Sequence, residues 1–263
     1  MQFEVDRTLL DRFPGLVIGV VVGRNLLPPA EAGPIQDLLT AAEQDLRREW
    51  AGRPVQEHPR IAPWRETWAS LGLSARKYPS SIEALARRVL SGRPLPRISP
   101  LVDLYNAVSL RYRIPMGGHD ADTFVGAVRL GPTRGGEPFR PMFSQELNRV
   151  EAGEIAYMDG AEVLTRHWAW RQCHKDRITP QTRSVFIPID GLPVVGKEVV
   201  RAAAEEVAAH LQAWFGAEVW IGYATAESPL LSAPFRQSAP GCSAESAEHP
   251  PDIERANGER SSG

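Results

Sequence analysis

The chain has 263 residues, of which 43% are hydrophobic, and carries a formal net charge of −2 at pH 7. This length suits one large domain or one domain with a small partner, and the hydrophobic fraction suffices for a sizeable core. The near-neutral charge argues against non-specific nucleic-acid binding, which usually requires a strongly basic domain. A local basic patch remains compatible with the composition.

The cysteine content and the N-terminal sequence bear on the cellular compartment. Cys173 and Cys242 lie far apart and match neither a disulfide framework nor a paired metal-ligand spacing. The N-terminus lacks a basic segment followed by a long apolar run, so we expect no signal peptide. The apolar run at residues 15–23 is too short to cross a bilayer. We therefore expect a cytoplasmic protein without membrane association or a bound metal.

The first part of the chain alternates predicted strands and helices. The run at residues 16–22 is apolar almost throughout, which is typical of a fully buried strand. Ser80 and Glu83 form a capping box at the start of a helix. The predicted elements are strands at 3–5 and 16–22, helices at 35–50 and 80–90, and an aromatic, basic segment at 60–76.

Residues 94–124 combine a predicted helix with a polar loop. Ser99 suits the N-cap and Pro100 the first helical position, and the helix should end before Pro115. The loop that follows gathers glycines, a histidine and carboxylates, and one asparagine lies off the apolar stripe of the helix. We predict that these residues line a small-molecule pocket: Asn106, Gly117, Gly118, His119, Asp120 and Asp122.

The second part of the chain is richer in predicted strands. Asp159 and Gly160 predict the turn of a hairpin, and Gly216 closes a long amphipathic helix. Helices followed by strands, and then by a helix and a strand, favour an α+β fold, with one domain at 1–226 and a disordered tail at 227–263. The predicted elements are strands at 124–130, 183–189 and 217–223, a hairpin at 153–165 and a helix at 197–215.

His119, followed by Asp120, is the first catalytic candidate. An imidazole transfers protons near neutral pH, and an adjacent carboxylate can orient it, while the preceding glycines let a ligand approach closely. The alternative is a surface loop whose side chains bind local backbone groups. Glu137, in a turn after a strand, is a second candidate as a base or as an amine ligand. Its alternative is an ordinary exposed turn residue.

The segment at 166–177 is rich in aromatic and basic residues. Trp168 and Trp170 alternate as in a strand, which would put both on one face and Arg171 on the other. Aromatic rings beside arginines can stack on and clamp nucleotides. The alternative is a half-buried strand with one solvated face.

Several short motifs follow one another in a characteristic order. They are KYPSS at 77–81, LVDLYN at 101–106, PMGGHD at 115–120, WAWR at 168–171 and TPQTRSV at 179–185. Together they resemble the tRNA-binding and editing domain of the phenylalanyl-tRNA synthetase β subunit. They resemble more closely the stand-alone bacterial proteins that carry this domain alone. The resemblance spans residues 64–216.

The resemblance implies a three-layer (ββα) sandwich that contains an unusual β-sandwich. In the synthetase, this domain hydrolyses tyrosine wrongly esterified to the phenylalanine tRNA. Asn106 matches the pocket asparagine of the family. Gly117 stands where the family has a histidine, with His119 two residues later, and the glutamate that recognises the tyrosine hydroxyl falls near Pro188. The amino acid that this chain would remove is therefore open.

We accordingly predict a free-standing aminoacyl-tRNA deacylase that acts in trans, supports translation fidelity and needs no cofactor. Its partner would be the tRNA acceptor end, and neither DNA nor a membrane. The alternatives are a non-catalytic tRNA- or RNA-binding module, and a hydrolase of small amino-acid esters or amides. The expected catalytic residues are Asn106 and His119, with Gly117 and Gly118 in the pocket, Glu137 at the substrate's α-amino group, and Arg171 or Lys175 near the terminal adenosine or phosphates.

Overall fold

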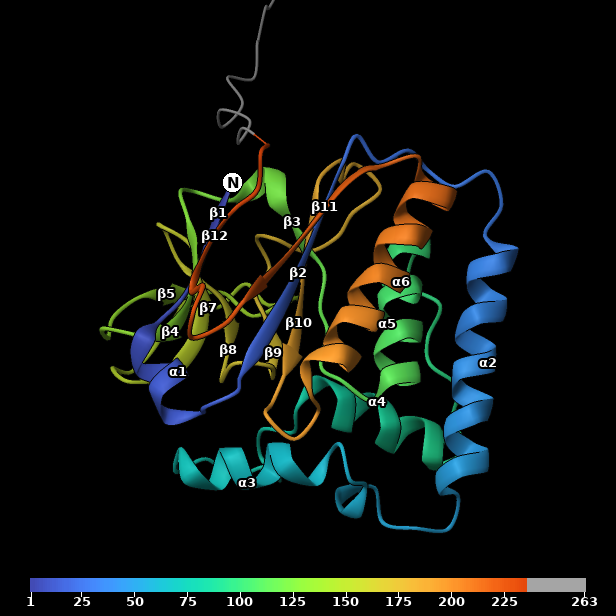
Figure 1. Ribbon diagram of the computed structural model, residues 1–263, viewed down its shortest axis with the longest axis horizontal. Coiled ribbons are helices and arrows are strands. Elements are labelled where there is room, and N and C mark those ends of the chain that lie inside the picture. Colours follow the sequence, from blue (N-terminus) through green and yellow to red (C-terminus); the bar gives the residue numbers. More distant parts are fainter. Residues whose placement is uncertain (236–263) are drawn as a thin grey trace, which may run out of the picture.

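The computed structural model describes residues 1–235 of the chain (Figure 1). Its helices lie mainly on one side of the strands, with α3 below them. The helices are α1 (Arg7–Arg12), α2 (Gly33–Trp50), α3 (Ala62–Ser70), α4 (Ser81–Leu90), α5 (Pro100–Tyr112) and α6 (Lys197–Phe215), with short 3-10 turns at Val55–Glu57 and Ala121–Thr123.

Within the described residues, the first sheet contains four strands in the order β11-β2-β10-β3. Neighbouring strands run antiparallel, and β2 and β10 pair along seven consecutive residues. Seven of the eight residues of β2 are buried, which agrees with the strand predicted from its apolar sequence. The bounds are β2 (Val17–Arg24), β3 (His119–Asp120), β10 (Val185–Gly191) and β11 (Glu218–Ala224).

A second sheet, of six strands within residues 1–235, has the order β12-β1-β4-β7-β8-β9. The N-terminal strand β1 pairs in parallel with β4 and antiparallel with β12. A short separate ribbon joins β5 (Pro138–Phe139) to β6 (Asn148–Arg149). The strands of the large sheet are β1 (Gln2–Val5), β4 (Val128–Pro132), β7 (Ile155–Met158), β8 (Val163–Arg166), β9 (Arg171–Gln172) and β12 (Leu230–Ser232).

The helices α6, α5 and α2 follow one another outward from the four-stranded sheet (Figure 1). Val200, Val207 and Leu211 of α6 are fully buried in one hydrophobic cluster with residues of β2 and β10. Each such side chain contributes roughly 1.5–3 kcal/mol of burial free energy. The predicted α+β class is confirmed, and the N-terminal strands and α2 extend the core, as their apolar faces require.

Local sequence signals account for several helix ends. The Ser80 and Ser99 hydroxyls accept hydrogen bonds from the backbone N–H groups of Glu83 and Val102, as the predicted N-caps require. The helix α6 has the predicted bounds, and Gly216 closes it in the left-handed region, with φ 60°.

Three predicted elements differ in the structure. The strand expected at 124–130 begins only at Val128, because the preceding residues form the Ala121–Thr123 turn and a loop. The segment around Trp168 is a tight turn instead of a strand. The predicted tail began at residue 227, but Leu230–Ser232 forms β12 against β1, so the folded part continues past that point. The rest of the predicted tail, 236–263, lies outside the described residues.

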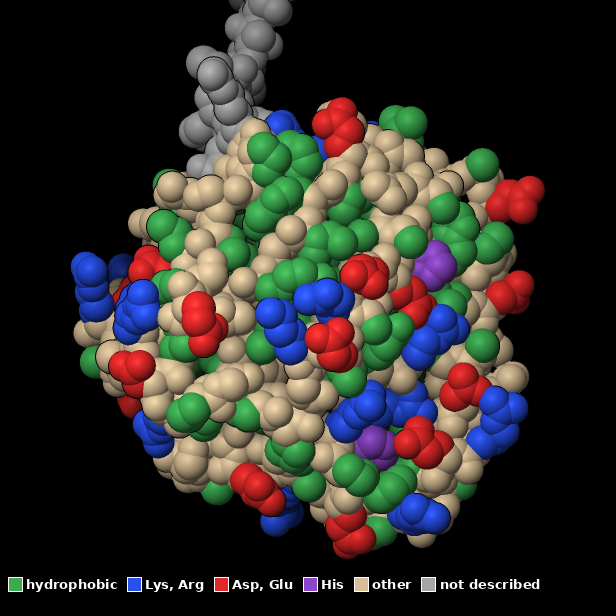
Figure 2. Space-filling model, in the orientation of Figure 1, with side chains coloured by type: hydrophobic (Ala, Val, Ile, Leu, Met, Phe, Trp, Pro, Cys, Tyr) green, Lys and Arg blue, Asp and Glu red, His purple; other side chains and the backbone are tan. Residues whose placement is uncertain are grey.

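The surface carries mixed charges on the face seen in Figure 2, where acidic and basic side chains are interspersed between apolar ones. No helix within residues 1–235 is long and apolar enough to cross a membrane.

Candidate functional site

A cavity of about 300 Å³ opens where the two sheets meet the helices α4 and α5. This volume lies in the range of small-molecule sites. Its wall is mostly apolar and aromatic, with a few polar groups. Lining residues include Ser81 and Leu85 of α4, Tyr105 and Asn106 of α5, Gly117, His119, Tyr157, Trp168, Trp170, Gln172, Pro188 and Asp190.

The structure brings Asn106, Gly117 and His119 to this one cavity. Asn106 is half-buried on α5 because it lies beside the apolar stripe, on the face that turns toward the cavity. A Cβ atom at Gly117 would lie 3.9 Å from His119 Nε2, so the imidazole reaches the place where a side chain at position 117 would begin. Gly118 packs against the Tyr105 ring, where a Cβ atom would lie only 2.5 Å from Tyr105 Cε1.

His119 is held by a buried carboxylate. Its Nδ1 atom lies 2.5 Å from Asp176 Oδ2, and the two side chains are 3% and 0% exposed. The other oxygen of Asp176 accepts hydrogen bonds from Gln172 Nε2 at 3.0 Å and from the Cys173 thiol at 3.3 Å. Because a carboxylate only accepts, Nδ1 carries the proton and the lone pair of Nε2 is free. Within residues 1–235, Nε2 has no hydrogen-bond partner.

The neighbouring carboxylate, Asp120, does not orient the imidazole, contrary to expectation. Its Oδ2 atom accepts from the Thr182 hydroxyl at 2.7 Å, and its Oδ1 atom accepts from the Asp122 backbone. Consecutive residues of a strand point to opposite faces, so the carboxylate of Asp120 is directed away from the imidazole of His119. The pKa of the Asp120 carboxyl is raised, and burial is the largest cause.

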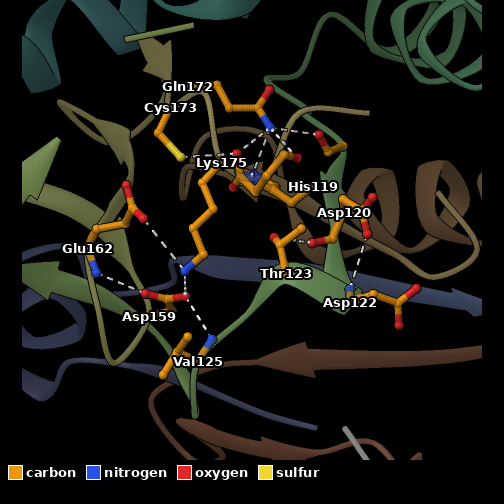
Figure 3. A network of polar contacts seen from close by, with 12 residues as sticks. His119, Asp120, Asp122, Thr123, Val125, Asp159, Glu162, Gln172, Cys173 and Lys175 are labelled. Carbon is orange, nitrogen blue, oxygen red and sulfur yellow. Dashed lines mark hydrogen bonds and ion pairs between the residues drawn. The ribbon is translucent and has the colours of Figure 1, made fainter. Parts of the chain in front are cut away.

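Asp176 and Gln172 were missed by sequence reasoning. Asp176 is 57 positions from His119 and sits in a segment that reads as aromatic and basic. Nothing in the local spacing indicates that the loop after β9 folds back against β3. In Figure 3, Gln172 and Cys173 belong to the same polar network as His119. The Lys175 side chain extends toward Asp159 and Glu162 instead.

A second carboxyl group, Asp190, lies at the buried end of the cavity. Its Oδ1 atom accepts from the Tyr157 hydroxyl at 2.5 Å and from Trp168 Nε1 at 3.0 Å. Burial raises the pKa of Asp190 to about 6. Asp190 was also missed, although a signal existed: it follows Pro188 by two residues on β10, and alternate strand residues share a face.

The turn after β8 brings Trp168 to the cavity. His167 and Trp168 both adopt left-handed backbone conformations, with φ of 44° and 63°, which are rare for such side chains. The Trp168 backbone N–H donates to Ile155, and its ring packs edge-on against Trp64 at 5.2 Å between ring centroids. The predicted strand was therefore wrong, because tertiary packing of Trp168 outweighs the alternating pattern.

Two other predicted site residues lie elsewhere. Glu137 accepts from the backbone N–H groups of Arg134 and Gly135 in an exposed turn. Lys175 pairs with Asp159 at 2.5 Å and with Glu162 at 3.7 Å (Figure 3). Neither lines the cavity.

Arg171 is exposed next to the cavity. Its guanidinium carbon lies 5.8 Å from the centroid of Trp170, a lining residue. The Tyr78 ring meets Trp170 edge-on at 4.7 Å, and Lys77 lies over Tyr78 at 5.1 Å. These four residues, Lys77, Tyr78, Trp170 and Arg171, form an aromatic and basic rim.

Within residues 1–235, no group of three or more His, Cys, Asp or Glu side chains is arranged to hold a metal ion.

Comparisons with known proteins show which family this chain belongs to. No curated protein matches the chain. Among solved structures, an N-terminal fragment of the phenylalanyl-tRNA synthetase β subunit from Pyrococcus horikoshii is similar, with 14% sequence identity and a TM-score of 0.44. The match covers 82% of this chain but only 49% of that fragment, so this chain spans about half of its length. The model of the B3/4 domain matches residues 63–213, close to the span expected from the motifs. The chain therefore belongs to the B3/4 domain family, the type of domain found in the phenylalanyl-tRNA synthetase β subunit.

Proposed function

We propose that the protein is an aminoacyl-tRNA deacylase that acts in trans and hydrolyses the ester between an amino acid and the 3′ end of its tRNA. The observation that carries this proposal is the His119–Asp176 pair, whose free imidazole nitrogen borders a cavity suited to a small molecule. Membership of the B3/4 family supports tRNA as the partner. We place the activity in the cytoplasm and the fold in the three-layer sandwich class expected of the family.

In the proposed mechanism, His119 is the general base. Its Nε2 atom takes a proton from a water molecule, and the resulting hydroxide attacks the ester carbonyl carbon. The tetrahedral intermediate then expels the ribose oxygen, which takes the proton back from Nε2. Asp176 is a positioning residue, because its carboxylate keeps the proton on Nδ1 and stabilises the imidazolium that forms transiently.

Asn106 is the proposed contact for the developing oxyanion. Its side-chain amide can donate hydrogen bonds into the cavity from the rigid helix α5. A preorganised donor of this kind typically contributes about 2.7–4 kcal/mol to transition-state stabilisation. An aminoacyl ester is already activated, so positioning and charge stabilisation are the main requirements.

The rim formed by Lys77, Tyr78, Trp170 and Arg171 is the proposed contact for the acceptor end. Trp170 and Tyr78 are half-buried aromatic residues beside two cationic side chains, and unpaired bases stack on aromatic rings of this kind. Binding through a local rim is compatible with the net charge of −2, because recognition of a single-stranded end needs only a small basic surface.

The direct test uses purified full-length protein and a panel of tRNAs, each charged with a matched or mismatched amino acid. We expect faster ester loss for at least one charged tRNA, and loss of that acceleration in His119→Gln. The matched control is His210→Gln, since His210 lies on α6 and stacks on Trp214 at 4.0 Å, away from the lining residues. Unchanged ester lifetimes across the panel would refute the activity.

One observation favours a second function, a non-catalytic tRNA-binding module: Gly117 occupies the place of the family histidine. Such a module would bind tRNA without hydrolysing it, so wild type and His119→Gln would not differ in ester hydrolysis. Hydrolysis of small amino-acid esters is distinguished by the same assay, because it would proceed equally well without the tRNA.

A further inference from the structure

The buried end of the cavity contains an acid without a cation. Asp190 is only 3% exposed, and its Oδ1 atom accepts from both Tyr157 and Trp168. Its Oδ2 atom has no hydrogen-bond partner within residues 1–235, although Asp190 lines the cavity. One oxygen is therefore fixed by the protein, and the other is available to a ligand.

The missing counter-charge sets Asp190 apart from two other deeply buried acids. Glu43 pairs with Arg97 at 3.0 Å, and Glu83 pairs with both Arg65 and Arg87. Asp190 forms no salt bridge with any residue in 1–235. With a pKa of about 6, its carboxyl is mainly ionised at neutral pH. An unpaired buried charge is costly, so the site is electrostatically incomplete without a cationic ligand.

The cavity wall around Asp190 suits a cation. The rings of Tyr105, Tyr157 and Trp168 line the same space, and aromatic faces attract ammonium groups. Asp190 is also close to the proposed reaction centre. Tyr157, whose hydroxyl donates to Asp190, has its ring centroid 6.3 Å from that of the His119 ring. In an aminoacyl ester, the α-nitrogen is only two bonds from the carbonyl carbon that a water molecule would attack.

We propose that Asp190 binds the α-ammonium group of the esterified amino acid and so orients its carbonyl carbon toward His119. This inference rests on the proposed deacylase function. It gives Asp190 the role that the sequence suggested for Glu137, whose carboxylate is occupied by the backbone of its own turn. Tyr157 and Trp168 are positioning residues, since they hold Oδ1 and leave Oδ2 toward the ligand.

The test compares wild type with Asp190→Asn on paired substrates. Asparagine keeps the shape and can still accept from Tyr157 and Trp168, but its amide loses the charge. For an aminoacyl-tRNA with a free α-ammonium group, we expect kcat/KM to fall by about 10- to 100-fold, the loss of one charged hydrogen bond. For the α-N-acetylated form of the same aminoacyl-tRNA, we expect the two proteins to differ by less than about 2-fold. The matched control is Asp103→Asn, a buried aspartate on α5 that bonds to the Ile98 backbone.

A binding measurement keeps this inference separate from the hydrolytic activity. Phenylalaninamide, lysinamide and their α-N-acetyl forms are titrated into the full chain and followed by NMR. We expect both free amides to bind wild type more tightly than Asp190→Asn, and α-acetylation to remove the difference. This result would support the ammonium site even if no charged tRNA were hydrolysed.

Two outcomes would overturn the proposal. The first is equal affinity of wild type for free and α-acetylated amides, or no binding of either. The second is tight binding of α-N-acetyl-lysinamide that Asp190→Asn abolishes, which would assign Asp190 to a side-chain ammonium instead. Urea unfolding of Asp190→Asn and Asp103→Asn establishes that both are folded. A change in substrate preference can then be attributed to the site and not to unfolding.

Discussion

The Nδ1 atom of His119 lies 2.5 Å from Oδ2 of Asp176, although 57 positions separate the two residues. Both side chains are buried, yet the opposite ring nitrogen of His119 borders the cavity that Asn106 and Gly117 also line. This relationship defines which nitrogen carries the proton and which can accept one. Substitutions of the polar residues around the cavity should therefore have different effects on activity and stability.

Replacing Asp176 with Asn should reduce hydrolysis by at least about 100-fold, because the amide would favour the wrong tautomer of His119. We expect the loss in kcat, with KM for aminoacyl-tRNA little changed. Single-turnover kinetics across pH 5–9 measure it, with urea unfolding to verify the fold. An unchanged rate and pH profile would show that Asp176 is merely structural.

Stability should fall as pH rises from about 4 to about 6, through the titration of Asp190. Burial raises its folded-state pKa from 3.8 to about 6, so the native state retains a proton that the unfolded chain has lost. The protonated form is favourable below pH 4, and this contribution is lost as pH passes 6, at a cost on the order of 2–3 kcal/mol. His119 and Tyr157 are the titratable groups around it.

Urea denaturation at pH 4.5 and 7.5 measures this effect. Asp190→Asn should remove this part of the pH dependence and be more stable than wild type at pH 7.5, since it removes an unpaired buried charge. A variant that is less stable at pH 7.5 would contradict the prediction. Greater stability combined with weaker substrate binding would identify Asp190 as a residue retained for function.

Two adjacent glycines should respond differently to alanine. At Gly118, a Cβ atom would lie 2.5 Å from the buried Tyr105 ring, so Gly118→Ala should cost about 1–3 kcal/mol of unfolding free energy. At Gly117, the nearest atom is His119 Nε2 at 3.9 Å, so Gly117→Ala should stay within about 0.5 kcal/mol of wild type. Chemical denaturation of the pair measures both, and similar losses would contradict the packing described for Tyr105.

Trp170→Ala should raise KM for aminoacyl-tRNA but leave the hydrolysis of small aminoacyl esters unchanged. The loss of one stacked base costs about 1–3 kcal/mol, which corresponds to a rise in KM of roughly 5- to 150-fold. Hydrolysis of free aminoacyl esters at saturation should be unchanged within about 2-fold. Trp214→Ala, on α6, is the matched control. Equal KM values for wild type and Trp170→Ala would exclude the rim as the acceptor-end contact.

The sequence by itself determined the local structure and part of the site. Apolar spacing and the caps at Ser80, Ser99 and Gly216 indicated the helices, because these signals act within a few residues. Asn106 and His119 were predictable as cavity residues, since one helix and the loop after it place both.

Only the tertiary structure decided which carboxylates serve the site. Asp176 reaches His119 because the loop after β9 folds against β3, and Asp190 becomes a buried acid because β10 is central in its sheet. Likewise, packing of Trp168 against Trp64 imposes a turn where alternation predicts a strand. The physical reason is common to all three. Burial and long-range pairing arise from the whole fold, whereas sequence patterns report only on neighbours along the chain.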